Sequence, residues 1–227
     1  MSTNLSGNIL TLGSTSINEE TLKAIKSYYY VPDNCSAGDT VILDGIECLC
    51  VATGVTIQGS DLTRIAVDKN HDLGYYQKYV GMNIDGATIS TIVEWRWGGY
   101  YTGIGTSNNE GYGLKNTIKC LANKAVYTKG GSSNNNTCPL MWLGVNDFRS
   151  SHSDKWFVPS ANELKNYVYP YKSSLTFDTT TGGPSNDYFW SSSEYDGDYA
   201  NYVYFRSGSI DEFAKFAALS VRLCRAF

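Results

Sequence analysis

The sequence is short of positive charge, of histidine and of long apolar runs. Its formal net charge is −4 over 227 residues. It therefore has no basic stripe to displace counterions from phosphate, and a nucleic-acid partner is not expected. No run approaches eighteen apolar residues, so membrane insertion is not expected either. Met1–Gly13 lack a basic stretch followed by an apolar run, so no signal peptide is visible.

The groups that most enzymes rely on are also scarce. The two histidines, His71 and His152, lie far apart in the sequence, and no G-x-S-x-G elbow surrounds a serine near either. The spacing of Cys and His offers no zinc site. Gly103-Ile104-Gly105 is not followed by the Lys-Ser/Thr pair of a phosphate-binding loop. We therefore expect a protein that is not an enzyme, with no catalytic residues, no metal and no cofactor.

Cysteine is present, but its spacing matches no common disulfide or metal-binding motif. No C-x-x-C pair occurs, and an even count allows disulfides in a secreted chain. A chain of this length does not need a disulfide scaffold, so scattered reduced thiols are the favoured interpretation. The six cysteines are Cys35, Cys48, Cys50, Cys120, Cys138 and Cys224.

Tyrosine is the abundant residue. Eighteen Tyr outnumber eight Phe and three Met, whereas the apolar (42%) and charged (18%) fractions are those of a folded globular protein. A tyrosine hydroxyl needs a polar partner when it is buried, but the ring covers contact area at little entropic cost. The composition therefore favours an exposed recognition surface.

The first half of the chain predicts an entry segment, residues 1–30, ahead of one domain at 31–227. Ser16-Ile17-Asn18-Glu19 fits a capping box for a short helix whose apolar face holds Leu22 and Ile25. Asp44-Gly45 between apolar runs predicts a hairpin. Further predicted elements are a strand at 62–67, an irregular loop over 83–113, a helix at 113–123 and a polar loop at 130–136.

The second half predicts a small antiparallel sheet. Ser160 would cap a helix, with Glu163 closing the capping box. After a loop at 178–186, strands are expected at 188–192, 200–205 and 219–225, paired with one another because they are close in sequence. The expected fold class is α+β, with two helices, a small antiparallel sheet and long irregular loops.

Three motifs resemble those of a bacterial and phage group with a C-type-lectin fold of the formylglycine-generating-enzyme subtype. They are Trp156-Phe157-Val158-Pro159-Ser160-x-x-Glu163-Leu164, Phe189-Trp190-Ser191-Ser192-Ser193-Glu194 and Val221-Arg222-x-Cys224-Arg225. The stretch from Ile104 to Thr117 is also similar. The resemblance covers residues from about 60 onward. The oxidase of this subtype uses two cysteines near its C-terminus, whereas here Cys224 stands alone, so that activity is not expected.

Within that group, residues 188–227 resemble the variable region of proteins diversified by retroelements, in which a reverse transcriptase misreads template adenines. The resemblance implies that positions encoded by AAC or AAT codons are rewritten and form the ligand-binding surface. Candidate rewritten positions are Tyr195, Asp196, Asp198, Tyr199, Tyr202, Tyr204, Arg206, Ser207, Ser209, Asp211, Phe213, Ala214, Phe216, Ala217 and Ala218. Residues expected to form the fixed framework are Trp190, Glu194, Ala200, Val203, Phe205, Gly208, Ile210, Glu212, Lys215, Leu219, Val221 and Arg222.

The two-residue period of a strand supports this division independently of the resemblance. If Val203 and Phe205 face the core, Tyr202 and Tyr204 stand side by side on the other face. They could equally be ordinary half-buried strand residues. Glu194 and Arg222 could pair, or could both be solvated.

Three functions remain open at this stage. The favoured one is a diversified receptor-binding protein, such as a phage tail adhesin on a virion or extracellular-facing surface, that recognises a bacterial surface protein or glycan. The second is a non-diversified lectin-like domain that binds carbohydrate, with calcium held by Asn146-Asp147 or Asn186-Asp187, although the usual Glu-Pro-Asn and Trp-Asn-Asp signatures are lacking. The third is a structural virion component, with its aromatic face buried in a homo-oligomer.

Overall fold

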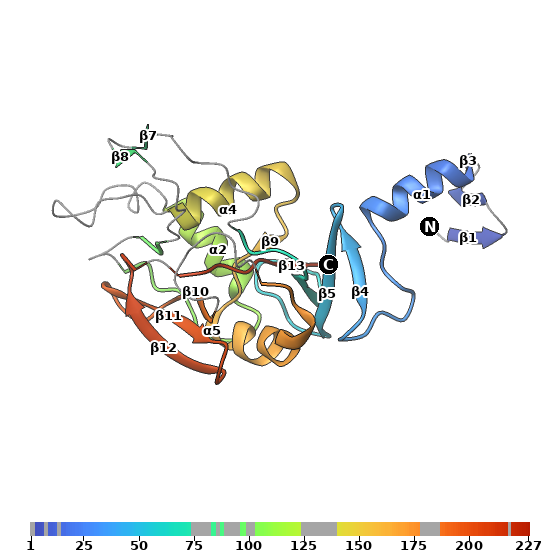
Figure 1. Ribbon diagram of the computed structural model, residues 1–227. Helices are drawn as coiled ribbons and strands as arrows, with labels where there is room; N and C mark the ends of the chain where they lie inside the picture. Colours follow the sequence, from blue (N-terminus) through green and yellow to red (C-terminus); the bar gives the residue numbers. More distant parts are fainter. Residues whose placement is uncertain are drawn as a thin grey trace.

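The computed structural model shows a mixed α+β protein built around two antiparallel sheets (Figure 1). The described residues are 18–73, 96–98, 103–123, 140–177, 187–217 and 219–227, together with the backbone of short strands at 3–6, 9–12, 15–17, 83–84 and 87–88. One sheet has five strands, in the order β4-β5-β6-β13-β9, and the other has three, in the order β10-β11-β12. No helix in this described part is long and apolar enough to cross a bilayer.

The five-stranded sheet begins with the predicted hairpin. Its strands are β4 (Thr40–Leu43), β5 (Ile46–Thr53), β6 (Arg64–Asp68), β9 (Trp156–Phe157) and β13 (Cys224–Ala226). Asp44 and Gly45 have φ angles of 55° and 77°, as expected for a tight turn of the mirror-image type. The Asp44 carboxylate accepts hydrogen bonds from Trp156 Nε1 (2.8 Å) and Arg225 Nε (2.7 Å), which fixes the turn to β9 and β13.

The three-stranded sheet contains β10 (Tyr188–Glu194), β11 (Tyr199–Tyr204) and β12 (Ser209–Ala214). The first two strands were predicted, but the predicted third strand, 219–225, does not join them: only its end is a strand, β13, which lies in the larger sheet. β12 takes that place because the short turn at 205–208 returns the chain directly alongside β11, with Tyr204 opposite Ser209.

Residues 219–223 instead run between the two sheets. Ser220 forms an isolated parallel bridge with Phe189 of β10, and Leu73 N–H donates to the Val221 carbonyl (2.9 Å). The chain then enters the five-stranded sheet as β13, between β6 and β9. The C-terminal strand therefore lies inside the larger sheet, between β6 and the edge strand β9 (Figure 1).

Within the described part of the domain, there is one helix beyond the two that were predicted at 113–123 and after Ser160. α2 (Gly113–Ala122) was expected, and α4 (Leu140–Ser151) was not. α5 (Ala161–Glu163) continues into a π turn, η2 (Leu164–Val168), and a 3₁₀ turn, η3 (Tyr169–Ser174).

The Ser160–Glu163 capping box is confirmed, and it also organises the loop before α2. The Glu163 carboxylate accepts from the N–H groups of Ser160 (2.7 Å), Gly111 (2.9 Å) and Gly113 (3.1 Å). Burial raises the pKa of Glu163 to about 7, although the three hydrogen bonds act in the opposite direction.

The N-terminal segment extends away from the body (Figure 1). It comprises β1 (Thr3–Ser6), β2 (Ile9–Leu12), β3 (Thr15–Ile17) and α1 (Glu19–Tyr28). The predicted capping box at Ser16 was wrong. Asn18 caps α1 by accepting from Thr21 N–H at 2.8 Å, because Ser16 belongs to β3. Leu22 is buried, whereas Ile25 is exposed. β7 (Asn83–Ile84) and β8 (Ala87–Thr88) form a separate two-stranded pair.

The three-stranded sheet lies between two hydrophobic clusters. Trp190 and Ala200 belong to the cluster that contains Trp97. Phe189 and Val203 belong to the other, with β5, β6 and η2. Burying a large side chain of this kind contributes about 1.5–3 kcal/mol, so the middle of this sheet is fixed from both sides.

Candidate binding surface

Strand β11 separates the predicted framework residues from the predicted contact residues. Val203 and Phe205 are buried, with 0% and 4% of their surface exposed. Tyr202 and Tyr204 lie on the opposite face of the strand and are half-buried. The two-residue period therefore gives the alternation that the sequence predicted.

Strand pairing assembles residues from three strands on this outer face. Tyr202 lies opposite Trp190 of β10 and Asp211 of β12, and the part of this face at Trp190 is covered by the cluster that contains Trp97. Tyr204 lies opposite Tyr188 and Ser209 in the same way. Directly paired residues point to the same face of a sheet. We call the outward residues Tyr188, Tyr202, Tyr204, Ser209, Asp211 and Phe213 the tyrosine face.

Ring contacts hold the tyrosine face together. Tyr188 stacks on Tyr204 with ring centroids 4.7 Å apart and planes 15° apart, and it meets Tyr202 edge-on at 5.5 Å. Phe213 meets Tyr202 edge-on at 6.3 Å. Desolvation and the neighbouring Tyr204 raise the pKa of Tyr188. Such aromatic pairs contribute roughly 0.5–1.5 kcal/mol beyond their area, so the rings form an ordered surface.

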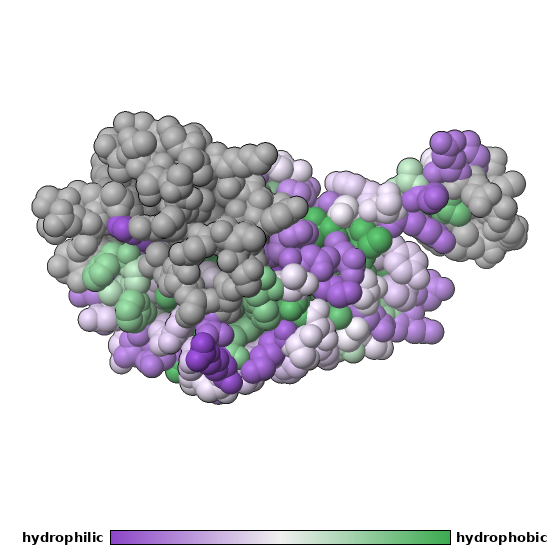
Figure 2. All heavy atoms as spheres, in the orientation of Figure 1, coloured by the Kyte–Doolittle hydropathy of each residue, from purple (hydrophilic) through white to green (hydrophobic). Residues whose placement is uncertain are grey.

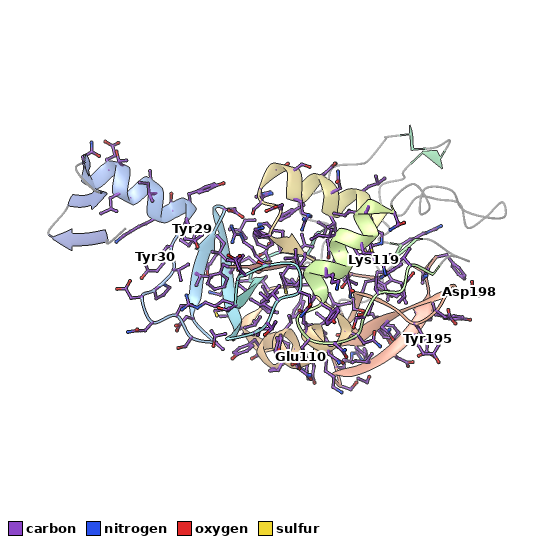
Figure 3. The ribbon with its side chains drawn as sticks, turned by 180° about the vertical axis from the view of Figure 1, so that it is seen from behind. Tyr29, Tyr30, Glu110, Lys119, Tyr195 and Asp198 are labelled. Atoms are coloured by element: carbon purple, nitrogen blue, oxygen red, sulfur yellow. The ribbon has the colours of Figure 1, made fainter. Side chains whose placement is uncertain are left out.

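The turns at each end of β11 extend this surface. Tyr195 is 62% exposed and Tyr199 is 42% exposed. Asp196 Oδ1 accepts from the N–H groups of Asp198 (2.7 Å) and Tyr199 (2.8 Å), which shapes the turn. At the other end, Arg206 forms an ion pair with Asp187 at 2.6 Å. Figure 3 shows Tyr195 and Asp198 at the outer end of the sheet.

The candidate positions lie on the surface throughout the described residues. Nine are exposed, namely Tyr195, Asp196, Tyr199, Arg206, Ser207, Ser209, Asp211, Phe213 and Phe216. Five are half-buried, namely Asp198, Tyr202, Tyr204, Ala214 and Ala217. Ala218 lies outside the described residues. In Figure 2, apolar and strongly hydrophilic residues adjoin over β11 and β12, at the lower left.

The framework positions show the opposite distribution. Only Ile210, half-buried, and Glu212, exposed, are accessible to solvent; the buried positions are Trp190, Glu194, Ala200, Val203, Phe205, Gly208, Lys215, Leu219, Val221 and Arg222.

A buried ion pair fixes the end of this sheet. Lys215 Nζ lies 2.9 Å from Glu194 Oε1, and the two side chains are 0% and 4% exposed. Glu194 also accepts from the N–H groups of Ile104 (2.9 Å) and Thr106 (3.3 Å). Lys215 Nζ lies 4.9 Å from the centre of the Trp97 ring. The ion pair and these contacts therefore hold the end of β10 and the residue after β12 against the loop at 104–106 and against Trp97.

The predicted Glu194–Arg222 pair was wrong. Arg222 pairs with Asp72 at 2.8 Å and donates to the carbonyls of Asp68, His71 and Thr176. The reason is that residues 219–223 leave β10 for the larger sheet, which carries Arg222 toward the 68–72 segment.

Sequence reasoning missed one member of the surface. Tyr188 is not among the candidate positions, yet it stacks on Tyr204; the register that pairs it with Tyr204 places it there, and its spacing of two from the predicted core residue Trp190 suggested the opposite. Asn201 could be encoded by the expected codons, but it is buried and donates to Asn108 Oδ1 (3.0 Å) and the Glu194 carbonyl (3.2 Å). It therefore belongs with the framework.

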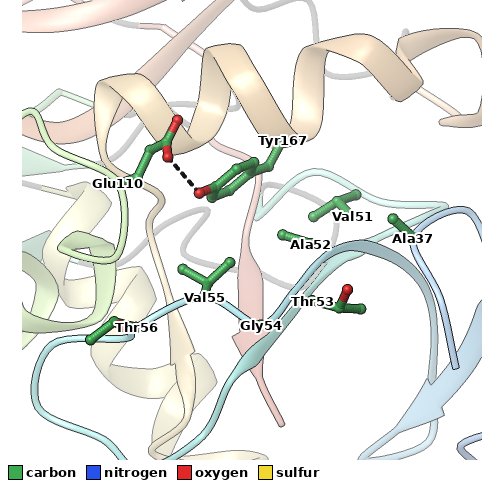
Figure 4. A pocket seen from close by; sticks show the side chains of 9 residues that line it. All are labelled: Ala37, Val51, Ala52, Thr53, Gly54, Val55, Thr56, Glu110 and Tyr167. Carbon is green, nitrogen blue, oxygen red and sulfur yellow. Dashed lines mark hydrogen bonds between the residues drawn. The ribbon is translucent and has the colours of Figure 1, made fainter.

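An open pocket of about 590 Å³ lies elsewhere (Figure 4). Small residues of β5 and the following turn line it, and none of the candidate positions contributes. Glu110 accepts from Tyr167 Oη and from Asn166 Nδ2, both at 2.7 Å. Burial and the neighbouring Glu110 raise the pKa of Tyr167. The carboxylate is thus already engaged by two donors.

One of the two loops considered for calcium binding is not a loop in the structure. Asn146 and Asp147 lie within α4, so they do not form the oxygen-rich loop that was considered. Asn186 lies outside the described residues, and Asp187 is engaged with Arg206. Among the described residues, no group of three or more His, Cys, Asp or Glu side chains is placed to hold a metal.

Cys35, Cys48, Cys50 and Cys224 have buried thiols that form no disulfide, and Cys120 is buried as well. Burial raises the pKa of the Cys48 and Cys224 thiols. Cys138 lies outside the described residues.

A scan against family models finds no match to this chain, and a search of curated proteins finds no similar sequence.

Proposed function

We propose that this chain is a binding protein with a C-type-lectin-like fold, diversified by a retroelement, whose ligand contacts the tyrosine face and the turns beside it. Its ligand is a protein or glycan on a bacterial surface, as for a phage tail adhesin. The observation that carries the proposal is the division of residues 190–222: the fourteen described candidate positions are all exposed or half-buried, whereas ten framework positions are buried.

The chemistry of the face supports recognition. Tyrosines provide rigid, amphipathic contact area, and Asp, Ser and Arg provide adaptable polar contacts, a composition typical of antibody-like binding sites. Surface substitutions usually change stability by only about 0.5 kcal/mol. Because the framework is fixed from both clusters, the outer residues can change without loss of the fold.

Two display libraries test the proposal. The first randomises Tyr199, Tyr202, Tyr204, Asp211 and Phe213, and the second randomises an equal number of buried positions in the same strands. Protease resistance on the cell surface measures folding. We expect most members of the first library to fold and to yield binders against unrelated protein targets, and few of the second to fold. Equal loss of folding in both libraries would contradict the proposal.

The flanking DNA tests diversification itself. We expect a near-copy of the 3′ end of the gene that differs only at adenines and lies near a reverse transcriptase gene. A copy that also differs at other bases, or no copy, would remove the retroelement from the proposal and leave the binding surface to be judged by the libraries.

A further inference from the structure

Four exposed or half-buried carboxylates lie on the strand and turn that border the aromatic part of the candidate surface. Asp211 lies on the tyrosine face directly opposite Tyr202, whereas Glu212, the next residue of β12, pairs with Asn201 and points to the other face of this exposed strand. Asp196 and Asp198 lie in the turn between β10 and β11. Asp196, Asp211 and Glu212 are exposed, and Asp198 is half-buried. The acidic groups are therefore available to a partner.

These charges are not balanced within the described part of the chain. Residues 195–214 contain a single basic residue, Arg206, which is ion-paired with Asp187 at 2.6 Å. Lys215, the next basic residue, is fully buried against Glu194. Within the described ranges, the four carboxylates have no Lys or Arg nitrogen within 4.0 Å.

Tyr199 and Tyr202 lie on β11 between the acidic turn and Asp211, and they point to opposite faces of the strand. The register places Tyr199 opposite Ala214 and Tyr202 opposite Asp211. The turn and Asp211 are therefore about 10 Å apart along the sheet, at roughly 3.3 Å per residue. The pKa of Tyr202 is raised by burial and then by Asp211 and Glu212, as expected where the potential at the ring is negative.

We propose that the partner of the tyrosine face is a protein segment that presents lysine or arginine side chains, an inference that rests on the proposed function. A guanidinium or ammonium group is attracted both to the face of a tyrosine ring and to a carboxylate beside it. Arg also stacks flat on aromatic rings. An acidic surface glycan would meet four uncompensated carboxylates, and a neutral glycan would leave them unpaired.

A peptide display library tests the partner class. The full chain is panned against random twelve-residue peptides, and in parallel it is applied to an array of neutral and acidic glycans. Selected peptides are synthesised as found and with each Lys or Arg replaced by Gln. We expect enrichment of Lys and Arg over the input library, and at least tenfold weaker binding of the Gln peptides.

Charge-neutral variants of the protein provide the matched comparison. The double variant Asp211→Asn/Glu212→Gln should bind the selected peptides about tenfold more weakly at 50 mM salt, and its binding should depend less on salt than that of the unmodified chain. The double variant Asp33→Asn/Asp61→Asn removes the same number of charges from exposed positions away from the sheet and should bind normally. Thermal melts verify that both variants fold.

The outcomes separate the two proposals. Selected peptides without Lys or Arg enrichment, or binding of glycans alone, would overturn the basic-partner inference while leaving the surface a binding site. Peptides or glycans that bind equally well after Tyr202→Ala/Tyr204→Ala, or no binding by any probe, would count against the proposed function as well.

Discussion

The buried Lys215–Glu194 pair gives a sharp test of how the framework is held. We consider Lys215→Met, which keeps the length of the side chain and removes its charge. The Glu194 carboxylate would then stay buried, and within the described part of the chain the donors to this side chain would be the Ile104 and Thr106 N–H groups. Removing one member of a buried ion pair costs about 3–5 kcal/mol, a large share of the 5–15 kcal/mol that stabilises a typical domain.

The second half of the test is a double-mutant cycle. Glu194→Gln keeps an oxygen that can accept from Ile104 but leaves the Lys215 ammonium without its carboxylate. In Glu194→Gln/Lys215→Met neither charge remains, so the combined loss should be smaller than the sum of the single losses. We expect a coupling energy of about 2–3 kcal/mol, measured by urea unfolding at pH 7 followed by circular dichroism.

Lys165→Met serves as the control for the loss of charge at Lys215. Lys165→Met, at an exposed position on η2, should change the free energy of unfolding by no more than about 0.5 kcal/mol. Strictly additive losses, or a loss below about 1 kcal/mol for Lys215→Met, would refute the argument that this pair fixes the sheet.

Further predictions concern the body of the protein. Gly111→Ala should cost at least about 2 kcal/mol, because at φ +79° the new Cβ would overlap the Thr56 carbonyl oxygen, whereas Gly59→Ala, at φ +86° with open space, should cost only about 1 kcal/mol; thermal melts of the two variants verify this. The folded state keeps the Glu163 proton to a higher pH than the unfolded chain does, so the free energy of unfolding should fall by about 3 kcal/mol as the pH rises from about 4.5 to 7. Urea titrations across that range should show this slope, and Glu163→Gln should flatten it. The buried Cys224 thiol should resist a thiol reagent at pH 8 until urea unfolds the chain; rapid labelling of the native protein would contradict its burial.

The parts of the fold that were predictable depend on residues close together in the sequence. The Asp44-Gly45 turn and the Ser160–Glu163 cap are each determined within four residues. The alternation of β11 also needs only one strand and its two-residue period. The outward placement of Tyr202 and Tyr204 follows from the same local pattern.

The parts that could not be predicted depend on long-range pairing. Leu219, Val221 and Leu223 alternate with polar residues, a pattern that suits a strand in either sheet. Contacts with Phe189 and pairing with β6, both distant in the sequence, determine where residues 219–226 lie. The pairing of Glu194 with Lys215 depends on the register of β12 against β11, which brings residue 214 opposite Tyr199, and that register was not predicted.

The path of residues 219–227 has a consequence for the diversification proposed above. A stop codon or frameshift anywhere in the candidate region would delete β13 and leave β6 and β9 without the strand that joins them. Such a product would lose its central sheet and fail to fold, so it could not display a damaged surface. If the candidate region is rewritten as proposed, this architecture would require an intact reading frame through β13 before a new surface is presented.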